Sequence, residues 1–212
     1  MYFGEVTDPN IRHIFRDAGD FIVRPLKCGK FTLYAYAIDG LTSGADTSEY
    51  VIKPITDNLR GDTVQALYTS ALRGRVYNSV ADPCRDLDTV ALKLVNGFCV
   101  VLFPGAGAIA FEVKTGEKRG ISPPEVENTV KGAKDAFVET VRTNTSLLRR
   151  HLRSPELRLY ETRVGRRSLT NVTVCYVEGI TNPTLVGRMK KRLNDTSVIP
   201  TISANCPRRI SS

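Results

Sequence analysis

The chain has 212 residues, of which 42% are hydrophobic and 25% are charged, and its formal net charge is +8. These values are close to those of soluble globular proteins and exclude a chain that is disordered throughout. The longest apolar run without a charge, residues 98–111, contains a proline and is far shorter than the roughly 20 residues that cross a bilayer, so no membrane span is expected.

The N-terminus has no basic segment followed by an apolar core, so we expect a cytosolic chain with reduced thiols. The five cysteines are widely spaced, form no CxxC pair and are accompanied by only two histidines. This pattern predicts no metal site and no cofactor site. Cys99 and Cys175 lie in apolar runs and are predicted to be core residues.

Residues 21–24 and 31–38 are rich in aromatic and β-branched side chains and are separated by a Cys-Gly pair, which predicts a hairpin of two edge-type strands. Residues 49–59 and 64–72 then carry apolar side chains at helical spacing. Pro54 limits the first of these two helices to a late start or a kink, because proline lacks the amide hydrogen that a helix interior needs.

A third helix is predicted at residues 86–94. Residues 98–103 and 108–113 are apolar runs joined by a proline- and glycine-rich turn, which predicts a hairpin whose strands are buried on both faces. We interpret Gly105 and Gly107 as parts of this turn and not as a nucleotide-binding loop, because no third glycine and no lysine completes a phosphate-binding motif.

The second half begins with a capping-box pattern, in which Ser122 is followed three residues later by Glu125, with prolines between them, and a helix is predicted to start at position 123. Gly132 interrupts this pattern and is interpreted as the joint between two domains. The elements predicted after the joint are a helix over residues 134–152, strands over residues 157–164 and 172–177, and a helix over residues 185–193.

The pattern as a whole predicts an α/β (α+β) fold. We expect two small subdomains, residues 1–131 and residues 132–212, each a mixed β-sheet packed with helices.

On the predicted helix over residues 134–152, Phe137 and Asn144 lie on one apolar face. A buried amide without a partner costs about 1–3 kcal/mol, so the Asn144 side chain is predicted to bond backbone groups of a neighbouring strand or of the joint. Arg142, Arg149 and Arg153 fall on a separate basic stripe of the same helix.

Basic residues are concentrated between positions 118 and 167, where twelve of them against six acidic residues account for +6 of the net charge. Such an excess can bind nucleic acid, anionic lipid head groups or an acidic protein surface, or it can be a solvated helix face. Few aromatic side chains lie among these cations, so nucleic-acid binding is disfavoured.

No enzyme signature is found. His13 and His151 lie in no recognisable nucleophile motif and are predicted to be surface residues. The close carboxylate pairs are spaced i, i+2, which on a helix points them to different sides. We therefore predict no catalytic residue.

Four motifs follow one another in a fixed order: R-x-I-x-x-P-x-x-E from Arg119, G-x-x-x-x-F-x-E from Gly132, T-N-x-x-L-x-R-R from Thr143 and P-x-L from Pro155. Together with further matching runs over most of residues 20–193, this series resembles the spore germinant receptor A-subunit (GerA) family. The further runs are residues 20–24, 37–41, 100–111, 164–165 and 176–179.

The resemblance implies the N-terminal region of a polytopic membrane protein that senses nutrient germinants and starts ion release. It implies partners among the B- and C-type receptor subunits and like subunits, a place on the cytosolic face of the spore inner membrane, two α/β subdomains and no catalytic site. It also implies further chain and membrane spans after position 193, so we interpret the sequence as truncated and the chain by itself as soluble. An A-subunit-like relative encoded with the dipicolinate channel genes has nearly the same motifs, and both identities stay open.

Two hypotheses for the candidate residues follow. The first is docking to an acidic partner surface or to anionic lipid head groups through the candidate docking residues Arg142, Arg149, Arg150 and Arg153, with Ser122, Glu125, Gly132, Phe137 and Asn144 in structural roles. The second is a module that binds a small nutrient ligand in the cleft between the subdomains, since such clefts are favoured binding sites.

Overall fold

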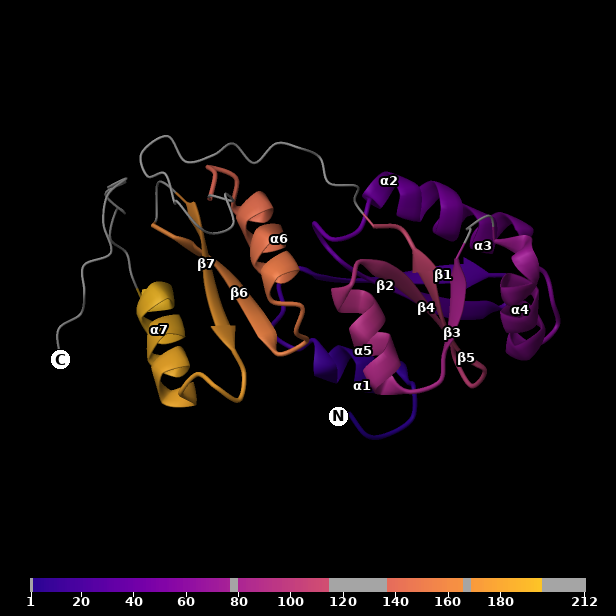
Figure 1. Cartoon of the computed structure of the whole chain (residues 1–212), viewed down its shortest axis with the longest axis horizontal. Helices are drawn as coiled ribbons and strands as arrows, with labels where there is room; N and C mark the ends of the chain where they lie inside the picture. Colours follow the sequence, from indigo (N-terminus) through magenta and orange to yellow (C-terminus); the bar gives the residue numbers. More distant parts are fainter. Residues whose placement is uncertain (1, 77–79, 115–136, 166–168, 196–212) are drawn as a thin grey trace, which may run out of the picture.

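The computed structural model describes residues 2–76, 80–114, 137–165 and 169–195. These residues form two lobes that lie side by side, an N-lobe of residues 2–114 and a C-lobe of residues 137–195 (Figure 1). Ser122, Glu125 and Gly132 lie outside the described residues. The predicted helix start, the joint and the subdomain boundary at residues 131 and 132 therefore stay predictions.

The N-lobe contains a five-stranded sheet in the order β1-β2-β4-β5-β3. The first predicted hairpin is confirmed by β1 (Phe21–Cys28) and β2 (Phe31–Ile38), which pair antiparallel along their whole length. Of these two strands, only β1 lies at an edge of the sheet. The prediction of two edge-type strands was wrong for β2, because its apolar residues also pair with β4 (Phe98–Phe103).

The second predicted hairpin is formed by β4 and β5 (Gly107–Glu112) and is also confirmed. Every residue of β4 is buried, as the prediction of strands covered on both faces requires. The amide of Ala106 donates to the carbonyl of Phe103 at 2.9 Å, so the glycine-rich segment is a tight turn.

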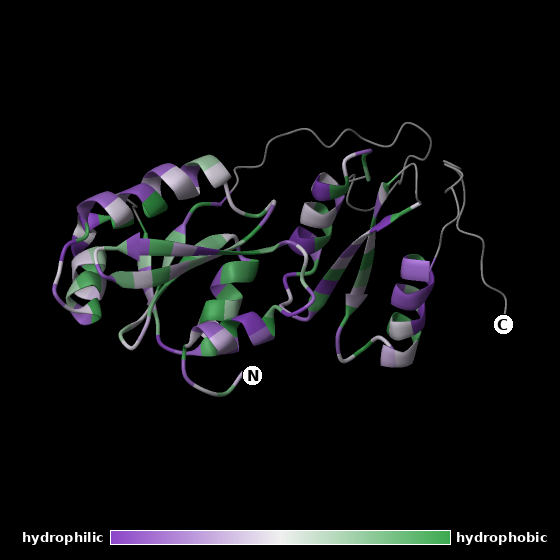
Figure 2. Ribbon diagram, turned by 180° about the vertical axis from the view of Figure 1, so that it is seen from behind, coloured by the Kyte–Doolittle hydropathy of each residue, from purple (hydrophilic) through white to green (hydrophobic). Residues whose placement is uncertain are grey.

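Helices cover both faces of this sheet, and alternate strand residues point to opposite layers. On β4, Val100 and Leu102 pack with one group of helices, whereas Val101 and Phe103 pack with the other. Figure 2 shows the hydrophobic residues gathered along these strands. The first group is α1 (Asp8–Ile14) and α5 (Leu87–Val95). The second is the π-helical turn Ser48–Ile52, which continues α2 (Gly44–Thr47), together with α3 (Lys53–Asn58) and α4 (Val64–Ser70).

The three helices predicted in the N-lobe are present; the second begins at Val64, as predicted, and the starts of the other two are shifted. The first begins at Gly44, where the Ser43 side chain caps it, and a π-helical turn (Ser48–Ile52) precedes the turn that contains Pro54. Two elements were not predicted: α1, which is short, and β3 (Ala81–Cys84), whose Pro83 is atypical of a strand.

The C-lobe contains a two-stranded sheet of β6 (Leu157–Val164) and β7 (Thr170–Val177), both predicted. Glu161 of β6 bonds Arg142 of α6 (Val141–His151), whereas the adjacent Tyr160 faces Lys190 of α7 (Pro183–Asp195). Adjacent strand residues point to opposite faces, so α6 and α7 cover opposite faces of this sheet.

The α/β fold class is thus confirmed. The named strands pair antiparallel in both sheets, and the sheets are not mixed in strand direction, because short hairpins connect most neighbours. Across the described ranges, no helix has the length and apolar content needed to cross a membrane.

The long C-lobe helix differs from its prediction. It begins at Val141 and not at residue 134, and Phe137, predicted to lie in the core, is 64% exposed. The Asn144 side chain explains the late start: its oxygen accepts from the Val138 amide at 2.8 Å and its nitrogen donates to the Val138 carbonyl at 2.6 Å. The amide therefore bonds backbone groups of the preceding segment, not of a strand.

Of the two cysteines predicted to lie in the core, one does and one does not. Cys99 on β4 is fully buried, as predicted. The prediction that Cys175 is a core residue was wrong, because β7 lies at an edge of the small sheet and Cys175 is exposed there.

Candidate functional site

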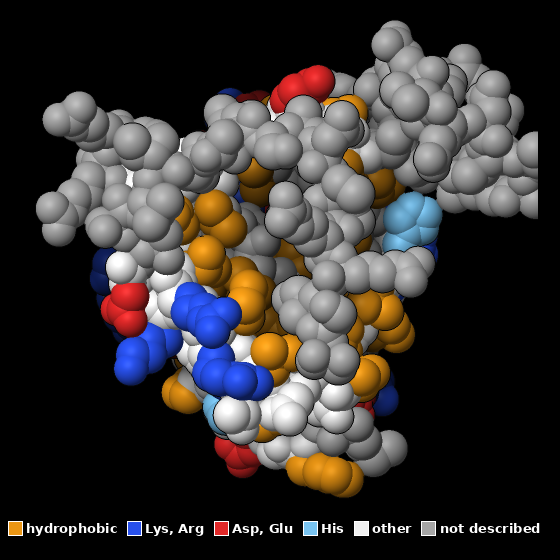
Figure 3. All heavy atoms as spheres, turned by 90° about the vertical axis from the view of Figure 1, so that its left-hand side faces the viewer, with side chains coloured by type: hydrophobic (Ala, Val, Ile, Leu, Met, Phe, Trp, Pro, Cys, Tyr) orange, Lys and Arg blue, Asp and Glu red, His pale blue; other side chains and the backbone are white. Residues whose placement is uncertain are grey.

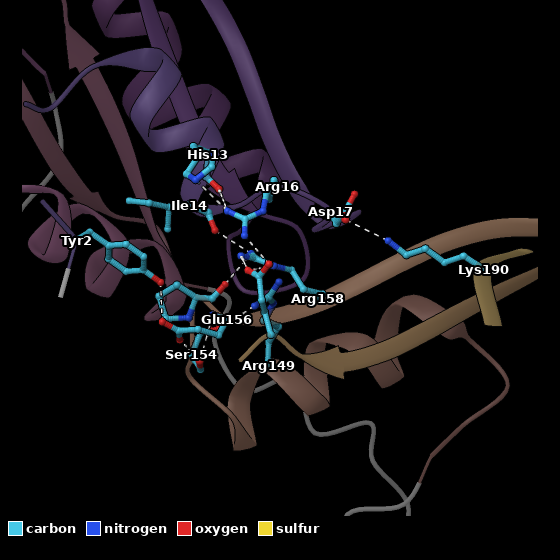
Figure 4. Close-up of polar contacts among 12 residues, drawn as sticks. Tyr2, His13, Ile14, Arg16, Asp17, Arg149, Ser154, Glu156, Arg158 and Lys190 are labelled. Carbon is cyan, nitrogen blue, oxygen red and sulfur yellow. Dashed lines mark hydrogen bonds and ion pairs between the residues drawn. The ribbon is translucent and has the colours of Figure 1, made fainter. Parts of the chain in front are cut away.

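Polar side chains gather where the C-lobe meets the N-lobe, a region that we call the junction (Figure 4). Its backbone part is short: Ala18 forms a parallel bridge with Leu159, and the amide of Gly19 donates to the Leu159 carbonyl at 2.9 Å. The edge of β6 is therefore closed by the chain of the N-lobe. Most of the remaining junction contacts are made by charged side chains.

The centre of the junction is a buried ion pair between Asp20 and Arg149, which are 1% and 0% exposed. Two parallel hydrogen bonds join them, from Arg149 Nε to Asp20 Oδ2 at 2.7 Å and from Arg149 Nη2 to Asp20 Oδ1 at 2.9 Å. Arg149 Nη1 also donates to the Ser154 carbonyl at 3.0 Å. This two-point geometry fixes direction as well as distance between the lobes.

A second arginine, Arg158, lies beside this pair and is 3% exposed. Its Nη1 donates to the Ile14 carbonyl of the N-lobe at 2.8 Å, and its guanidinium also bonds Glu178, which pairs with Arg16. Desolvation raises the pKa of Glu178, but the hydrogen bonds and charges of Arg158 and Arg16 outweigh it and lower that pKa below its ordinary value. Glu178 is therefore held as a carboxylate between two arginines.

Three further contacts surround this centre. Arg142 Nε bonds Asp39 of the N-lobe at 3.0 Å, and Lys190 of α7 bonds Asp17 at 3.0 Å. The Tyr2 hydroxyl donates to Glu156 at 2.6 Å, and burial together with this bond raises the Tyr2 pKa. The lobes are thus joined on several sides.

At Gly40, a backbone position of the junction, a side chain does not fit. Gly40 follows β2 with φ +82°, and a β-carbon there would lie 1.8 Å from Ser146 Oγ on α6. Glycine is required both for the backbone conformation and for the close approach of α6.

The four candidate docking arginines do not share one surface. The expectation that Arg149 lies on an exposed stripe was wrong, because α6 turns Thr145, Ser146 and Arg149 inward. Arg142 is occupied in ion pairs with Asp39 and Glu161. Sequence reasoning missed Asp20, Arg158 and Gly40, since no local pattern links Asp20 to a partner 129 positions away.

The remaining two candidates line a pocket of about 240 Å³ between the lobes. Arg150 and Arg153 of the C-lobe meet Lys114, Asn96 and Gly97 of the N-lobe there, and no acidic side chain is among the lining residues. Arg153 Nη1 donates to Asn96 Oδ1 at 3.3 Å. The chemistry of this pocket suits a small anion such as a carboxylate or phosphate.

The described residues carry no arrangement that favours bond-breaking chemistry. No group of three or more His, Cys, Asp or Glu side chains in these ranges could hold a metal ion. His13 and His151 are exposed, as predicted. Burial raises the pKa of Cys99 to about 12 and that of Cys84 to about 11, which keeps both thiols protonated. The site is built to hold two lobes together.

Comparisons with known proteins agree on one family. The family described as Bacillus/Clostridium GerA spore germination protein matches residues 9–205. Stage V sporulation protein AF of Bacillus subtilis (strain 168) is 31% identical over 180 residues, which are 84% of this chain and 36% of that protein. Spore germination protein GerLA of Bacillus cereus is 30% identical over 190 residues, which are 86% of this chain and 38% of that protein.

One solved structure has the same fold. It is the N-terminal domain of the A subunit of the Bacillus megaterium spore germinant receptor GerK3, with a TM-score of 0.66 and 22% identity. The match covers 86% of this chain and 68% of that domain. The chain therefore spans most of one domain fold and a little more than a third of the curated relatives.

Proposed function

Since the chain belongs to the GerA spore germination protein family, which matches residues 9–205, we propose that it works as the N-terminal part of a germination receptor A-type subunit. The resemblance of its motif series to this family is confirmed. Within that role it couples nutrient sensing elsewhere in the receptor to ion release. It has no enzymatic activity, and it acts at the cytosolic face of the spore inner membrane with B- and C-type subunits.

The observation that carries this proposal is the junction. A buried two-point ion pair, a second buried arginine and the outer pairs of Arg142 and Lys190 hold the lobes in one relative orientation. A displacement of one lobe is therefore passed to the other, which is what a coupling domain requires. A freely hinged pair of lobes lacks this property.

The experiment loosens the junction without unfolding the chain. Spores in which the encoding gene carries Arg142→Gln with Lys190→Gln lose two partly exposed pairs between the lobes, together with the Arg142–Glu161 pair inside the C-lobe, each worth little to folding. We expect a several-fold slower fall in optical density after nutrient addition, with the protein at its normal level on an immunoblot.

The matched control is Arg12→Gln with Lys53→Gln. It also removes one arginine and one lysine charge, but the ion pairs of these two residues lie within the N-lobe. Spores of this control are expected to germinate like the wild type. If the junction variant also germinates at the wild-type rate while its protein is present, the coupling proposal is wrong.

The basic pocket favours a second candidate function, the binding of a small anionic ligand between the lobes. Three cationic side chains, Lys114, Arg150 and Arg153, line its walls, and Glu112, which pairs with Lys114 at 2.9 Å, is not among the lining residues. Their net charge attracts an anion before contact, and salt weakens this attraction. In this reading the two arginines hold a ligand and do not dock on a partner or a lipid surface.

A thermal-shift titration tests the pocket with amino acids, sugars, nucleosides and dipicolinate. We expect a carboxylate ligand to raise Tm progressively with its concentration, because it stabilises the folded chain by about 2.7 kcal/mol at a hundred times its Kd. Arg150→Gln with Arg153→Gln is expected to abolish this shift, whereas Arg188→Gln with Lys191→Gln on exposed α7 keeps it. The absence of a Tm shift with every compound rejects the ligand function. Co-sedimentation with anionic vesicles then tests lipid docking by the same arginines.

A further inference from the structure

One side-chain contact at the junction depends on the protonation state of a histidine. Arg16 Nη1 lies 3.0 Å from His13 Nε2, near the end of α1 (Figure 4). A guanidinium is always charged and has no acceptor atom, so Arg16 can only donate in this contact. The imidazole of His13 therefore accepts, which requires its neutral form with the proton on Nδ1.

The same arginine reaches the C-lobe. Arg16 Nη2 donates to one carboxylate oxygen of Glu178, and Arg158 Nε donates to the other at 3.1 Å. Arg158 also donates to the carbonyl of Ile14, the residue that follows His13. The contacts of His13, Arg16 and Glu178 therefore form a series that begins on α1 and ends on the C-lobe.

The charges around His13 do not favour another positive charge. Arg16 and Arg158 already place two cations beside the single carboxylate of Glu178, and no carboxylate of the described ranges pairs with His13 itself. The chain carries a net charge of +8, and Figure 3 shows lysine and arginine side chains gathered on the C-lobe end of the molecule.

The other charged groups on α1 and on the elements packed against it are bonded to partners of their own. These bonds join Arg12 and Tyr36 to Asp8, Asp88 to the Tyr2 amide, Asp86 to Thr89, Lys93 to Asp82 and Lys190 to Asp17. His13 is exposed and exchanges protons with solvent.

We propose that His13 makes the junction sensitive to pH: its protonation removes the acceptor of Arg16, places two positive charges 3.0 Å apart and weakens the bond from Arg16 to Glu178 between the lobes. Imidazole ordinarily changes its charge between pH 5 and 8. The contact is present above this change and is lost as the pH falls through it. Glu178, whose pKa is lowered, and Tyr2, whose pKa is raised, keep their protonation states over the same range.

As a means of regulating the coupling between the lobes, this inference rests on the proposed function. Its test uses the purified chain and not spores, so either proposal can fail without the other. A junction that responds to pH in the purified chain, in a protein whose junction variants germinate normally, would separate the two.

The test is the stability of the purified 212-residue chain at about pH 7.5 and about pH 5.5, measured by urea unfolding. We expect the folding equilibrium constant to fall about two- to fivefold, the size of a partly exposed ion pair. His13→Gln keeps an acceptor oxygen that does not titrate, and Arg16→Gln removes the cation, so both variants are expected to lose most of this fall. His151→Gln, the matched control, removes the other histidine of the chain and should keep it.

Hydrogen exchange shows whether the effect lies at the junction. The amide of Gly19, which bonds the Leu159 carbonyl of the C-lobe, is expected to lose protection at the lower pH relative to the amide of Ala106, which bonds within the N-lobe. Comparing two amides at the same pH cancels the effect of pH on exchange itself. In His13→Gln the ratio should stay constant. An equal fall in stability in wild type and His13→Gln, or no loss of protection at Gly19 in the wild type, overturns the proposal.

Discussion

Replacing Arg149 with methionine is expected to lower the free energy of unfolding by about 3–5 kcal/mol, because it leaves the Asp20 carboxylate buried without its partner. The substitution also removes the bond from the guanidinium to the Ser154 carbonyl. Urea unfolding followed by circular dichroism measures the change. A loss of this size is a large fraction of the stability of a typical domain.

Two companion variants distinguish the loss of the ion pair from the loss of side-chain packing as the cause of the destabilisation. Asp20→Leu with Arg149→Met removes both charges and is expected to recover part of the lost stability, since apolar pairs often replace buried ion pairs without loss. Arg12→Met removes an arginine from the exposed pair with Asp8 and is expected to cost no more than about 1 kcal/mol. If Arg149→Met costs no more than Arg12→Met, the junction is not held by this pair.

The N-lobe was predictable because its signals are local. Apolar runs on both sides of a proline- and glycine-rich turn predict β4 and β5, and the structure buries these strands on both faces. Asp86, at the start of the helix predicted over residues 86–94, caps α5 by accepting from the Thr89 amide at 2.7 Å. The short α1 and the proline-containing β3 have no such signal and were missed.

A physical reason explains why the junction could not be predicted from the sequence. A helical wheel of the long C-lobe helix places the most apolar residues inward, but α6 packs against the other lobe with polar residues. Arg149 is buried only because Asp20 is there to neutralise it, and that partner comes from the other lobe. For this reason the helical-wheel prediction placed Arg149 on a basic stripe with the other arginines of the helix and not in the core.

Replacing Gly40 with alanine is expected to destabilise the chain by about 2–6 kcal/mol, the sum of a strained backbone and an overpacked contact. The backbone there has φ +82°, and the new β-carbon would lie 1.8 Å from Ser146 Oγ. The helix must move away from the N-lobe, so the amides of Gly19 and Asp39, which bond across or beside the junction, should exchange faster. Urea unfolding and hydrogen exchange measure the two effects.

Gly29→Ala is the matched control for this substitution. Gly29 also has a positive φ, +58°, but no atom lies within 4 Å of the place that a β-carbon would take, so only the backbone strain of about 1–3 kcal/mol is expected. Adding Ser146→Gly to Gly40→Ala removes the clashing hydroxyl and should restore slow exchange at Gly19. Equal effects of Gly40→Ala and Gly29→Ala, without faster exchange at Gly19, would mean that the close approach of α6 does not hold the lobes together.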